Sequence, residues 1–183
     1  MRSFVASDVS NPLVIVGLPG AGKTSLVSFF AKQFHSEHKR DKANSNNDKN
    51  SNAGASQTSV ISHFIGAAPD STNIRNSLAR LVKEIALHFD LELADVPDNF
   101  SDLQNMFKET IEKVGKMSEK RLILIIDALN QLDATNHAHA LEWLPTELPG
   151  YPPLPPQKPL SYPLHLCGIV TFRFIVLSPP FAF

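Results

Sequence analysis

The sequence predicts an α/β fold, a three-layer sandwich in which helices cover both faces of a mostly parallel sheet. Apolar runs at 13–16 and 122–126 have the character of strands buried on both faces, and a further strand is expected at 59–65. Helical patterns separate these strands, which is the order that builds parallel sheets. The sandwich is expected to be incomplete, with an irregular proline-rich tail at 150–183.

The first strand leads into a glycine-rich loop. Residues 13–28, LVIVGLPGAGKTSLVS, fill the G-x-x-x-x-G-K-[ST] pattern of a phosphate-binding P-loop. Glycines let backbone N–H groups approach phosphate oxygens, where a Cβ would obstruct them. Lys23 supplies a charge for the β- and γ-phosphates, and the Thr24 hydroxyl can bind Mg²⁺. The predicted fold is therefore that of a P-loop NTPase, with these residues at the nucleotide: Gly17, Gly20, Ala21, Gly22, Lys23, Thr24 and Ser25.

A helix is expected after the loop, followed by an insertion. Apolar residues at 26, 27, 29, 30 and 34 form a stripe that can pack on the sheet. Residues 36–57 contain almost no apolar side chain, so they cannot bury enough area to offset the entropy of ordering. We expect residues 36–57 to be a disordered surface insertion and residues 1–12 to be a connector.

The middle of the chain predicts one strand and two helices. Strand 59–65 is followed by turn residues, and apolar spacing predicts a helix at about 72–88 with an N-cap at Asp70 or Ser71. A capping box at Ser101 predicts the start of the next helix, and Gly115 its end. His63 has no His or Cys partner at metal spacing, so it is expected to be packed or hydrogen-bonded.

Asp127 closes the apolar run at 122–126. An acid directly after a buried parallel strand lies at the carboxyl edge of the sheet, where ligands bind in open α/β folds. In a P-loop protein this acid holds Mg²⁺ directly or through its water shell. The predicted metal ligands are therefore Thr24 and Asp127, and the predicted cofactors are Mg²⁺ and a nucleotide, ATP or GTP.

With both motifs in hand, the chain resembles the NACHT group of STAND-type P-loop NTPases over about residues 11–149. The resemblance is carried by VIVGLPGAGKTSLVS, SHFIGAAPDSTNIRNSLARL, LILIIDALNQLD and WLP. It implies a nucleotide-dependent switch module of a larger assembly protein. It also implies that other proteins bind through flanking regions and that the full-length protein forms a nucleotide-dependent oligomer.

The chain departs from that family after Asp127. Many NACHT modules carry two further acids there, one of which is thought to activate water, whereas this chain has Asn130 and Gln131. Gln131 can orient a water but cannot take a proton efficiently, and Asp133 is an alternative acid. The predicted catalytic residues are Asp127, Gln131 and Asp133, with slow or absent hydrolysis. ATP is favoured over GTP because no N-K-x-D element is present, although 130–133 resembles one with Gln in place of Lys.

The prolines concentrate from Pro149 onward, and the preferred interpretation of residues 150–183 is a tail outside the regular fold. One alternative makes 169–171 the family's missing strand, with Arg173 near a phosphate. Another treats residues 151–163 as a ligand for a proline-binding module. A transmembrane helix is disfavoured because the apolar run at 164–177 is short and interrupted by charge.

Composition narrows the class of protein. A net charge of -1 gives no general attraction to nucleic acid or to anionic membranes, so neither is an expected partner. The single cysteine and the absence of a signal-peptide pattern in residues 1–10 predict a cytoplasmic location. The rival hypothesis is a non-catalytic interaction fragment that keeps the fold without holding nucleotide.

Overall fold

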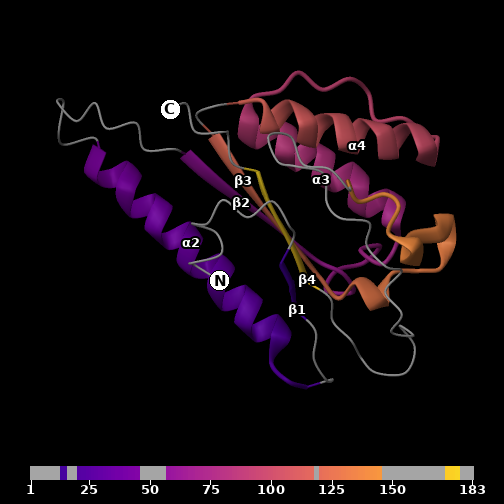
Figure 1. Ribbon diagram of the computed structural model, residues 1–183, viewed down its shortest axis with the longest axis horizontal. Helices are drawn as coiled ribbons and strands as arrows, with labels where there is room; N and C mark the ends of the chain where they lie inside the picture. Colours follow the sequence, from indigo (N-terminus) through magenta and orange to yellow (C-terminus); the bar gives the residue numbers. More distant parts are fainter. Residues whose placement is uncertain (1–12, 16–19, 46–56, 118–119, 146–171, 178–183) are drawn as a thin grey trace.

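A computed structural model describes residues 13–15, 20–45, 57–117, 120–145 and 172–177 (Figure 1). Within these residues no helix is long and apolar enough to cross a bilayer. The elements, in chain order, are β1 Leu13–Ile15, α2 Lys23–Ser45, β2 Gln57–Phe64, α3 Ile74–Phe89, α4 Phe100–Gly115, β3 Lys120–Asp127, the 3-10 helices η1 Leu129–Gln131 and η2 Thr135–Ala140, and β4 Phe172–Leu177.

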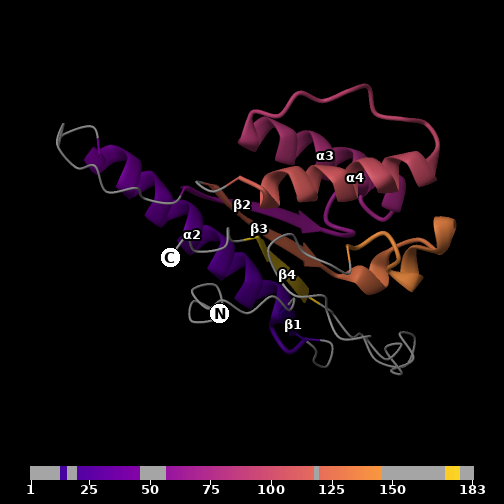
Figure 2. The same cartoon turned by 45° about the horizontal axis from the view of Figure 1, so that its top comes forward.

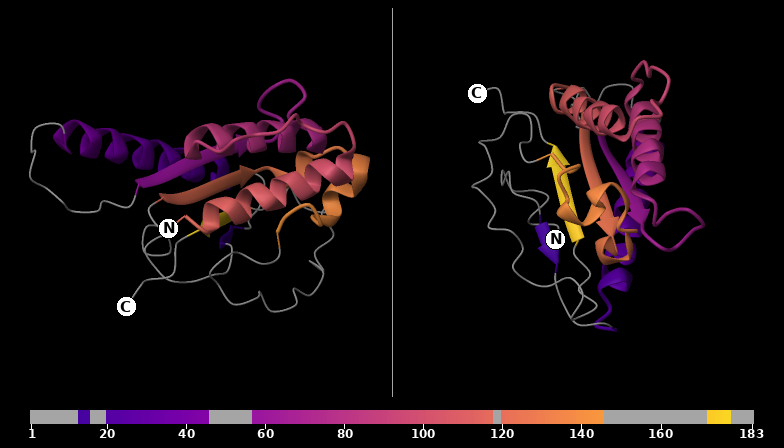
Figure 3. Two further views of the ribbon diagram at one scale, coloured as in Figure 1. Left: turned by 90° about the horizontal axis from the view of Figure 1, so that it is seen from above. Right: turned by 90° about the vertical axis from the view of Figure 1, so that its right-hand side faces the viewer.

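The strands form one sheet in the order β1-β4-β3-β2. Strands β2 and β3 pair in parallel, with Gln57 opposite Lys120 and Phe64 opposite Asp127. Because β4 is antiparallel to both β1 and β3, the strands β1, β2 and β3 all run in the same direction. The β2–β3 pairing is parallel and the two pairings of β4 are antiparallel, which is consistent with the predicted incomplete α/β fold. The strands β2 and β3 end at the same edge, beside η1 and η2 (Figure 3, left).

Helices cover both faces of this sheet, as a three-layer sandwich requires. Helix α2 lies on one face, and α3 and α4 lie together on the other (Figure 2). Alternate side chains of β2 and β3 enter the two cores, because successive residues of a strand point to opposite faces. The α2 core takes Val60, Ile123 and Ile125, whereas the α3–α4 core takes Ile61, Leu122, Leu124 and Ile126.

Strand β4 corrects the prediction for the C-terminal segment. Residues 172–177 lie inside the sheet between β1 and β3, so the expectation of a tail outside the regular fold is wrong for them. Their sequence, FRFIVL, is rich in aromatic and β-branched residues, and a neighbour on each side completes the hydrogen-bond ladder. The alternative strand at 169–171 lies outside the described residues, as does the proline-rich segment. Arg173 lies opposite Ile126, one residue before Asp127.

Helix α2 corrects the prediction of an insertion at 36–57. The helix continues to Ser45, and Gln57 already belongs to β2, so the prediction is wrong for 36–45 and for 57. Five of the ten residues at 36–45 are Glu, Lys, Arg or Ala, which have high helix propensity. The first half of α2 is anchored on the sheet, so the extension needs only propagation and no new nucleus. Residues 46–56 lie outside the described residues.

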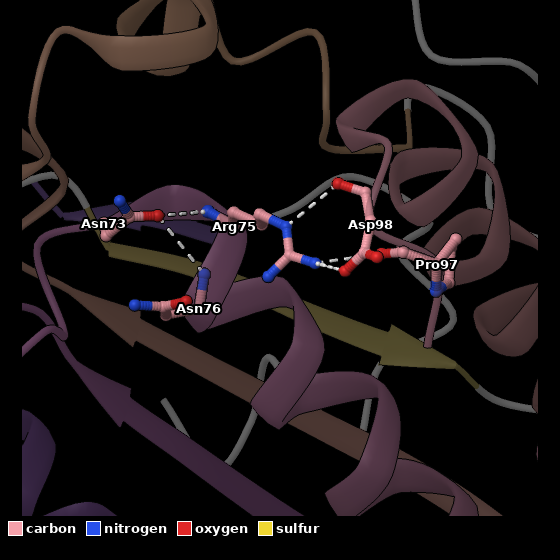
Figure 4. A network of polar contacts seen from close by, with 5 residues as sticks. All are labelled: Asn73, Arg75, Asn76, Pro97 and Asp98. Atoms are coloured by element: carbon pink, nitrogen blue, oxygen red, sulfur yellow. Dashed lines mark hydrogen bonds and ion pairs between the residues drawn. The ribbon is translucent and has the colours of Figure 1, made fainter. Parts of the chain in front are cut away.

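The start of α3 is held by a polar network (Figure 4). Asn73 is the N-cap, later than predicted, and its side chain accepts hydrogen bonds from the backbone N–H groups of Arg75 (3.0 Å) and Asn76 (3.4 Å). The Arg75 guanidinium donates to the Pro97 and Asp98 carbonyls and pairs with the Asp98 carboxylate at 3.0 Å. This network ties the segment before α4 to the first turn of α3.

Helix α4 begins two residues earlier than its predicted capping box at Ser101 indicates. Asn99 is the N-cap and accepts a hydrogen bond from the Ser101 backbone N–H at 2.8 Å. The helix ends at Gly115, as predicted. Its buried side chains pack with those of α3 on the same core.

Candidate functional site

The glycine-rich loop delivers its last residues directly to the start of α2. Gly20 and Gly22 have φ angles of +75° and +79°, in the left-handed region where a side chain would be strained. Gly17 lies outside the described residues. The other predicted nucleotide contacts are exposed except Lys23, which is 7% exposed: Gly20, Ala21, Gly22, Thr24 and Ser25. The described part of the cradle is therefore open to a ligand, while the lysine at its base is enclosed.

Asp127 is the last residue of β3 and is only 1% exposed. Ile123 and Ile125 point into the α2 core, so the alternation of the strand turns Asp127 to the same face. That face carries the N-terminus of α2, with Lys23 and Thr24. The structure thus brings together the three charged or hydroxyl side chains that the two motifs predict for this site.

The groups around Asp127 shift the pKa of its carboxyl in opposite directions. Burial raises the pKa of the Asp127 carboxyl, while hydrogen bonding with Thr24 and the Ala128 backbone amide, and the charge of Lys23, act to lower it. Oδ1 of Asp127 is buried and makes no hydrogen bond within the part of the chain that the structure describes. A buried acceptor without a partner is rare in folded proteins and indicates that a ligand or ion completes it.

The donor atoms at this edge fit Mg²⁺. This cation prefers hard oxygen ligands, and proteins usually supply one or two of them while water and phosphate supply the rest. Asp127 and Thr24 match that pattern. No cluster of three or more His, Cys, Asp or Glu occurs among the described residues, so an all-protein metal cage is not formed there.

The polar residues that follow Asp127 are directed to different places. Asn130 has its side-chain oxygen buried, without a hydrogen-bond partner in the described part of the chain. Gln131 is exposed, and its side chain lies so close to Gly66 that a Cβ there would overlap it. Asp133 accepts a hydrogen bond from the Thr72 hydroxyl at 3.1 Å, and its backbone N–H donates to the Thr72 carbonyl at 2.9 Å. These contacts join the segment after β3 to the segment after β2.

His63, at the end of β2, is buried and fully hydrogen-bonded, as expected for this residue. Arg80 can only donate, so Nδ1 of His63 accepts from it at 2.9 Å. Nε2 then carries the proton and donates to the Ser77 hydroxyl at 2.9 Å, which donates in turn to the Ser71 carbonyl at 3.0 Å. Burial, and after it the charge of Arg80, lower the pKa of His63 to about 4, against an opposing hydrogen bond with the Ser71 backbone.

Ser71 extends this chain of hydrogen bonds to the loop after β2. Its hydroxyl accepts from the Gly66 backbone N–H at 2.8 Å and donates to the Ala68 carbonyl at 2.6 Å. Gly66 itself has a φ angle of +79°. The His63 network therefore shapes the loop against which Gln131 packs, a role that no local sequence pattern indicated.

Comparison with known proteins decides the family. Residues 4–155 match the family model described as "AAA ATPase domain". The chain belongs to that family. This AAA ATPase domain is 30% identical over 142 residues to "NACHT and WD repeat domain-containing protein 2" of Mus musculus, a match that covers 77% of the chain and 7% of that protein. No solved structure matches.

Two further relatives show the same pattern of coverage. The domain is 28% identical over 147 residues to "NACHT domain- and WD repeat-containing protein 1" of Mus musculus, covering 78% of the chain and 8% of that protein. It is 24% identical over 186 residues to a "TPR repeat-containing protein" of Dictyostelium discoideum, covering 81% of the chain and 10% of that protein. The chain thus spans 7% to 10% of the relatives that it matches. The predicted NACHT-type P-loop fold is confirmed, and the domain is a nucleotide-binding one.

Proposed function

We propose that this domain binds a Mg²⁺-nucleotide, ATP in preference to GTP, as a slowly hydrolysing switch module of a larger assembly protein. One observation carries the proposal. At the carboxyl edge of the sheet, the buried Lys23 and the hydroxyl of Thr24 meet a buried Asp127 whose Oδ1 has no hydrogen-bond partner in the described part of the chain.

Each residue has a defined task in this proposal. The backbone N–H groups of the glycine-rich loop donate to phosphate oxygens, and the positive end of α2 adds to their attraction. Lys23 neutralises charge on the β- and γ-phosphates. Thr24 and Asp127 hold the metal. Mg²⁺, when bound, would supply neutralisation of the charge on the two terminal phosphates.

Slow hydrolysis is supported by the side chains after β3. Gln131 is exposed and neutral, so it can orient a water but is a poor base. Asp133, the alternative acid, accepts a hydrogen bond from Thr72. The same contact supports the preference for ATP, because Asp133 would be the carboxylate of a guanine-reading element and is engaged elsewhere.

We infer the role as a switch from the repeat domains that related proteins contain. Two of the relatives are named as proteins with a NACHT domain and WD repeats, and a third as a TPR repeat-containing protein. We infer that this domain is likewise part of a longer cytoplasmic protein, that flanking regions bind other proteins, and that the nucleotide controls an oligomer of the full-length protein.

Thermal unfolding with nucleotide tests the proposal. Mg²⁺-ATP at about a hundred times its Kd should stabilise the domain by roughly 2.7 kcal/mol, and Mg²⁺-GTP at the same concentration by less. Lys23→Ala should abolish the shift, because the phosphate charge is left uncompensated. Lys32→Ala, an exposed lysine of the same helix, should keep it.

Two outcomes would contradict the proposal. The absence of any shift with the parent protein would favour the alternative, an interaction fragment that keeps the fold without nucleotide. An equal shift for Lys23→Ala would remove the loop from the phosphate site. Phosphate release measured in a single turnover then checks the slow hydrolysis.

A further inference from the structure

We propose that Asn130 is a positioning residue of the metal site, and that its carboxamide oxygen accepts a hydrogen bond from a water of the Mg²⁺ hydration shell. The inference rests on the proposed function. The observation behind it is that two buried oxygens, Oδ1 of Asp127 and Oδ1 of Asn130, lie three residues apart in one turn, each without a hydrogen-bond partner in the described part of the chain.

Unpaired buried oxygens are few in the described part of the chain. Only Asp127, Asn130 and Ser62 have one there. Leaving a buried acceptor unpaired is costly, and in folded proteins such atoms are explained by a function or by a bound water or ion. The concentration of two of the three within four residues points to one shared partner.

The backbone holds Asn130 in the turn that follows Asp127. Ala128 adopts a left-handed conformation, with φ 61° and ψ 42°, and turns the chain directly into η1. The Gln131 backbone N–H donates to the Ala128 carbonyl at 2.8 Å and closes the turn. The buried side chain of Leu129, 3% exposed, anchors η1 in the α3–α4 core. Asn130 is therefore held in place before any ligand arrives.

The neighbouring polar side chains differ from Asn130. The side chain of Gln131 is exposed and lies against Gly66, and the carboxylate of Asp133 accepts from Thr72. Of these three residues, Asn130 is the one with a buried oxygen that has no hydrogen-bond partner in the described part of the chain.

The chemistry of an amide suits this task. Mg²⁺ retains several waters in proteins, and each water has two O–H groups to donate. A carboxamide oxygen accepts such a bond without adding negative charge. A second carboxylate beside the buried Asp127 would repel it and disfavour its ionised form. The neutral Asn130 therefore orients the hydration shell while Asp127 keeps its charge for the metal.

The test is the Mg²⁺ dependence of ATP affinity, with thermal unfolding of the ligand-free protein as a second readout. Asn130→Leu should weaken ATP binding in saturating Mg²⁺ by roughly tenfold or more, the usual effect of losing an outer-shell partner. Its affinity in EDTA should equal that of the parent. Its ligand-free melting temperature should be unchanged or higher, because an unpaired acceptor has been removed.

Two further variants sharpen the comparison. Ser62→Ala removes the other unpaired buried oxygen, which lies on β2, and should change neither the Mg²⁺ dependence nor the affinity in EDTA. Asn130→Asp keeps an acceptor but adds a negative charge that repels Asp127, so its Mg²⁺-dependent affinity should lie between those of the parent and of Asn130→Leu. Titration with Mn²⁺ in the presence of ATP, monitored by electron paramagnetic resonance, should rank the metal affinities of the variants in the same order.

The outcomes are distinguishable. Equal Mg²⁺ dependence of Asn130→Leu and the parent would overturn the role of Asn130 and leave the proposed function standing. A clear loss of ligand-free stability in Asn130→Leu would show that Asn130 has a structural partner and would also overturn it. A parent that binds no ATP, with or without Mg²⁺, would overturn the proposed function and this inference together.

Discussion

The two faces of the sheet differ, among the described residues, in how many side chains are buried against them. Among the described residues, the core under α3 and α4 contains 21 buried residues, whereas the core under α2 contains six. On the α2 helix, Leu26 and Phe29 remain 49% and 60% exposed. Hydrogen bonding also differs between the faces. On the α3 side both ring nitrogens of His63 have partners, whereas on the α2 side Oδ1 of Asp127 has none in the described part of the chain.

This difference separates stability from function within one sheet. Burial of apolar area is the main favourable term in folding, so the α3–α4 face supplies most of the stability. Functional sites tolerate unpaired polar groups and incomplete packing because ligands complete them. The α2 face, with Lys23 and Asp127, has that character.

The largest difference in stability is expected when a phenylalanine on each face is replaced by alanine. Phe107, on α4, is 0% exposed, and Phe107→Ala should cost about 3–5 kcal/mol through lost burial and the cavity left behind. Phe29→Ala makes the same chemical change at an exposed position of α2 and should cost about 0.5 kcal/mol or less. Urea denaturation measures both. Similar losses would show that the α2 face contributes as much as the other.

The paired histidine of the α3 face should make stability depend on pH. The pKa of His63 is about 4 in the fold, against 6.5 for the unperturbed group, so between these values the unfolded chain binds more protons. The contribution of neutral His63 to the free energy of unfolding is fully present above pH 6.5 and is lost as the pH falls towards 4. It amounts to about 3 kcal/mol in all.

Denaturation at a series of pH values checks this prediction. His63→Gln offers the matched control, because its amide can accept from Arg80 and donate to Ser77 without titrating. The variant should lose the slope between pH 6.5 and 4. A slope equal to that of the parent would assign the dependence to other groups.

A smaller effect, of opposite sign, is expected at Asp127. Burial raises its pKa, so its ionised form is disfavoured in the fold, and its contribution to stability declines as pH rises through the folded pKa. Asp127→Asn removes that charge and should stabilise the ligand-free domain at pH 7 by about 1 kcal/mol, while the Mg²⁺ dependence of ATP binding weakens. A destabilised Asp127→Asn would show that the carboxylate supports the fold, and would weaken the contrast between the faces.

Local patterns predicted that Lys23, Thr24 and Asp127 lie together, but they predicted the surrounding elements less completely. The glycine-rich loop and Asp127 are specified within a few residues each, and the strand and helix that flank them are equally local. The extension of α2 to Ser45 was missed because its sequence is polar on all sides, which resembles disorder unless the helix is already nucleated.

The remaining features depend on contacts between distant segments. The placement of β4 between β1 and β3 follows from pairing across most of the chain, which no window of the sequence contains. The amide at Asn130 was noticed in the sequence only as the loss of an acid. Its buried, unpaired oxygen becomes visible once the left-handed turn at Ala128 and the core position of Leu129 are known.

The position of β4 also determines when β1 can join the sheet as the protein is made. In the described sheet, β1 is joined to the other strands only through β4, and residues 16–171 separate the two partners. Pairings of such long sequence separation form late, because the chain between them must first be confined. During synthesis, β2, β3 and the helices α3 and α4 can assemble before residues 172–177 leave the ribosome. The strand β1 waits for this late pairing, whereas the start of α2, with Lys23 and Thr24, can already pack against β2 and β3.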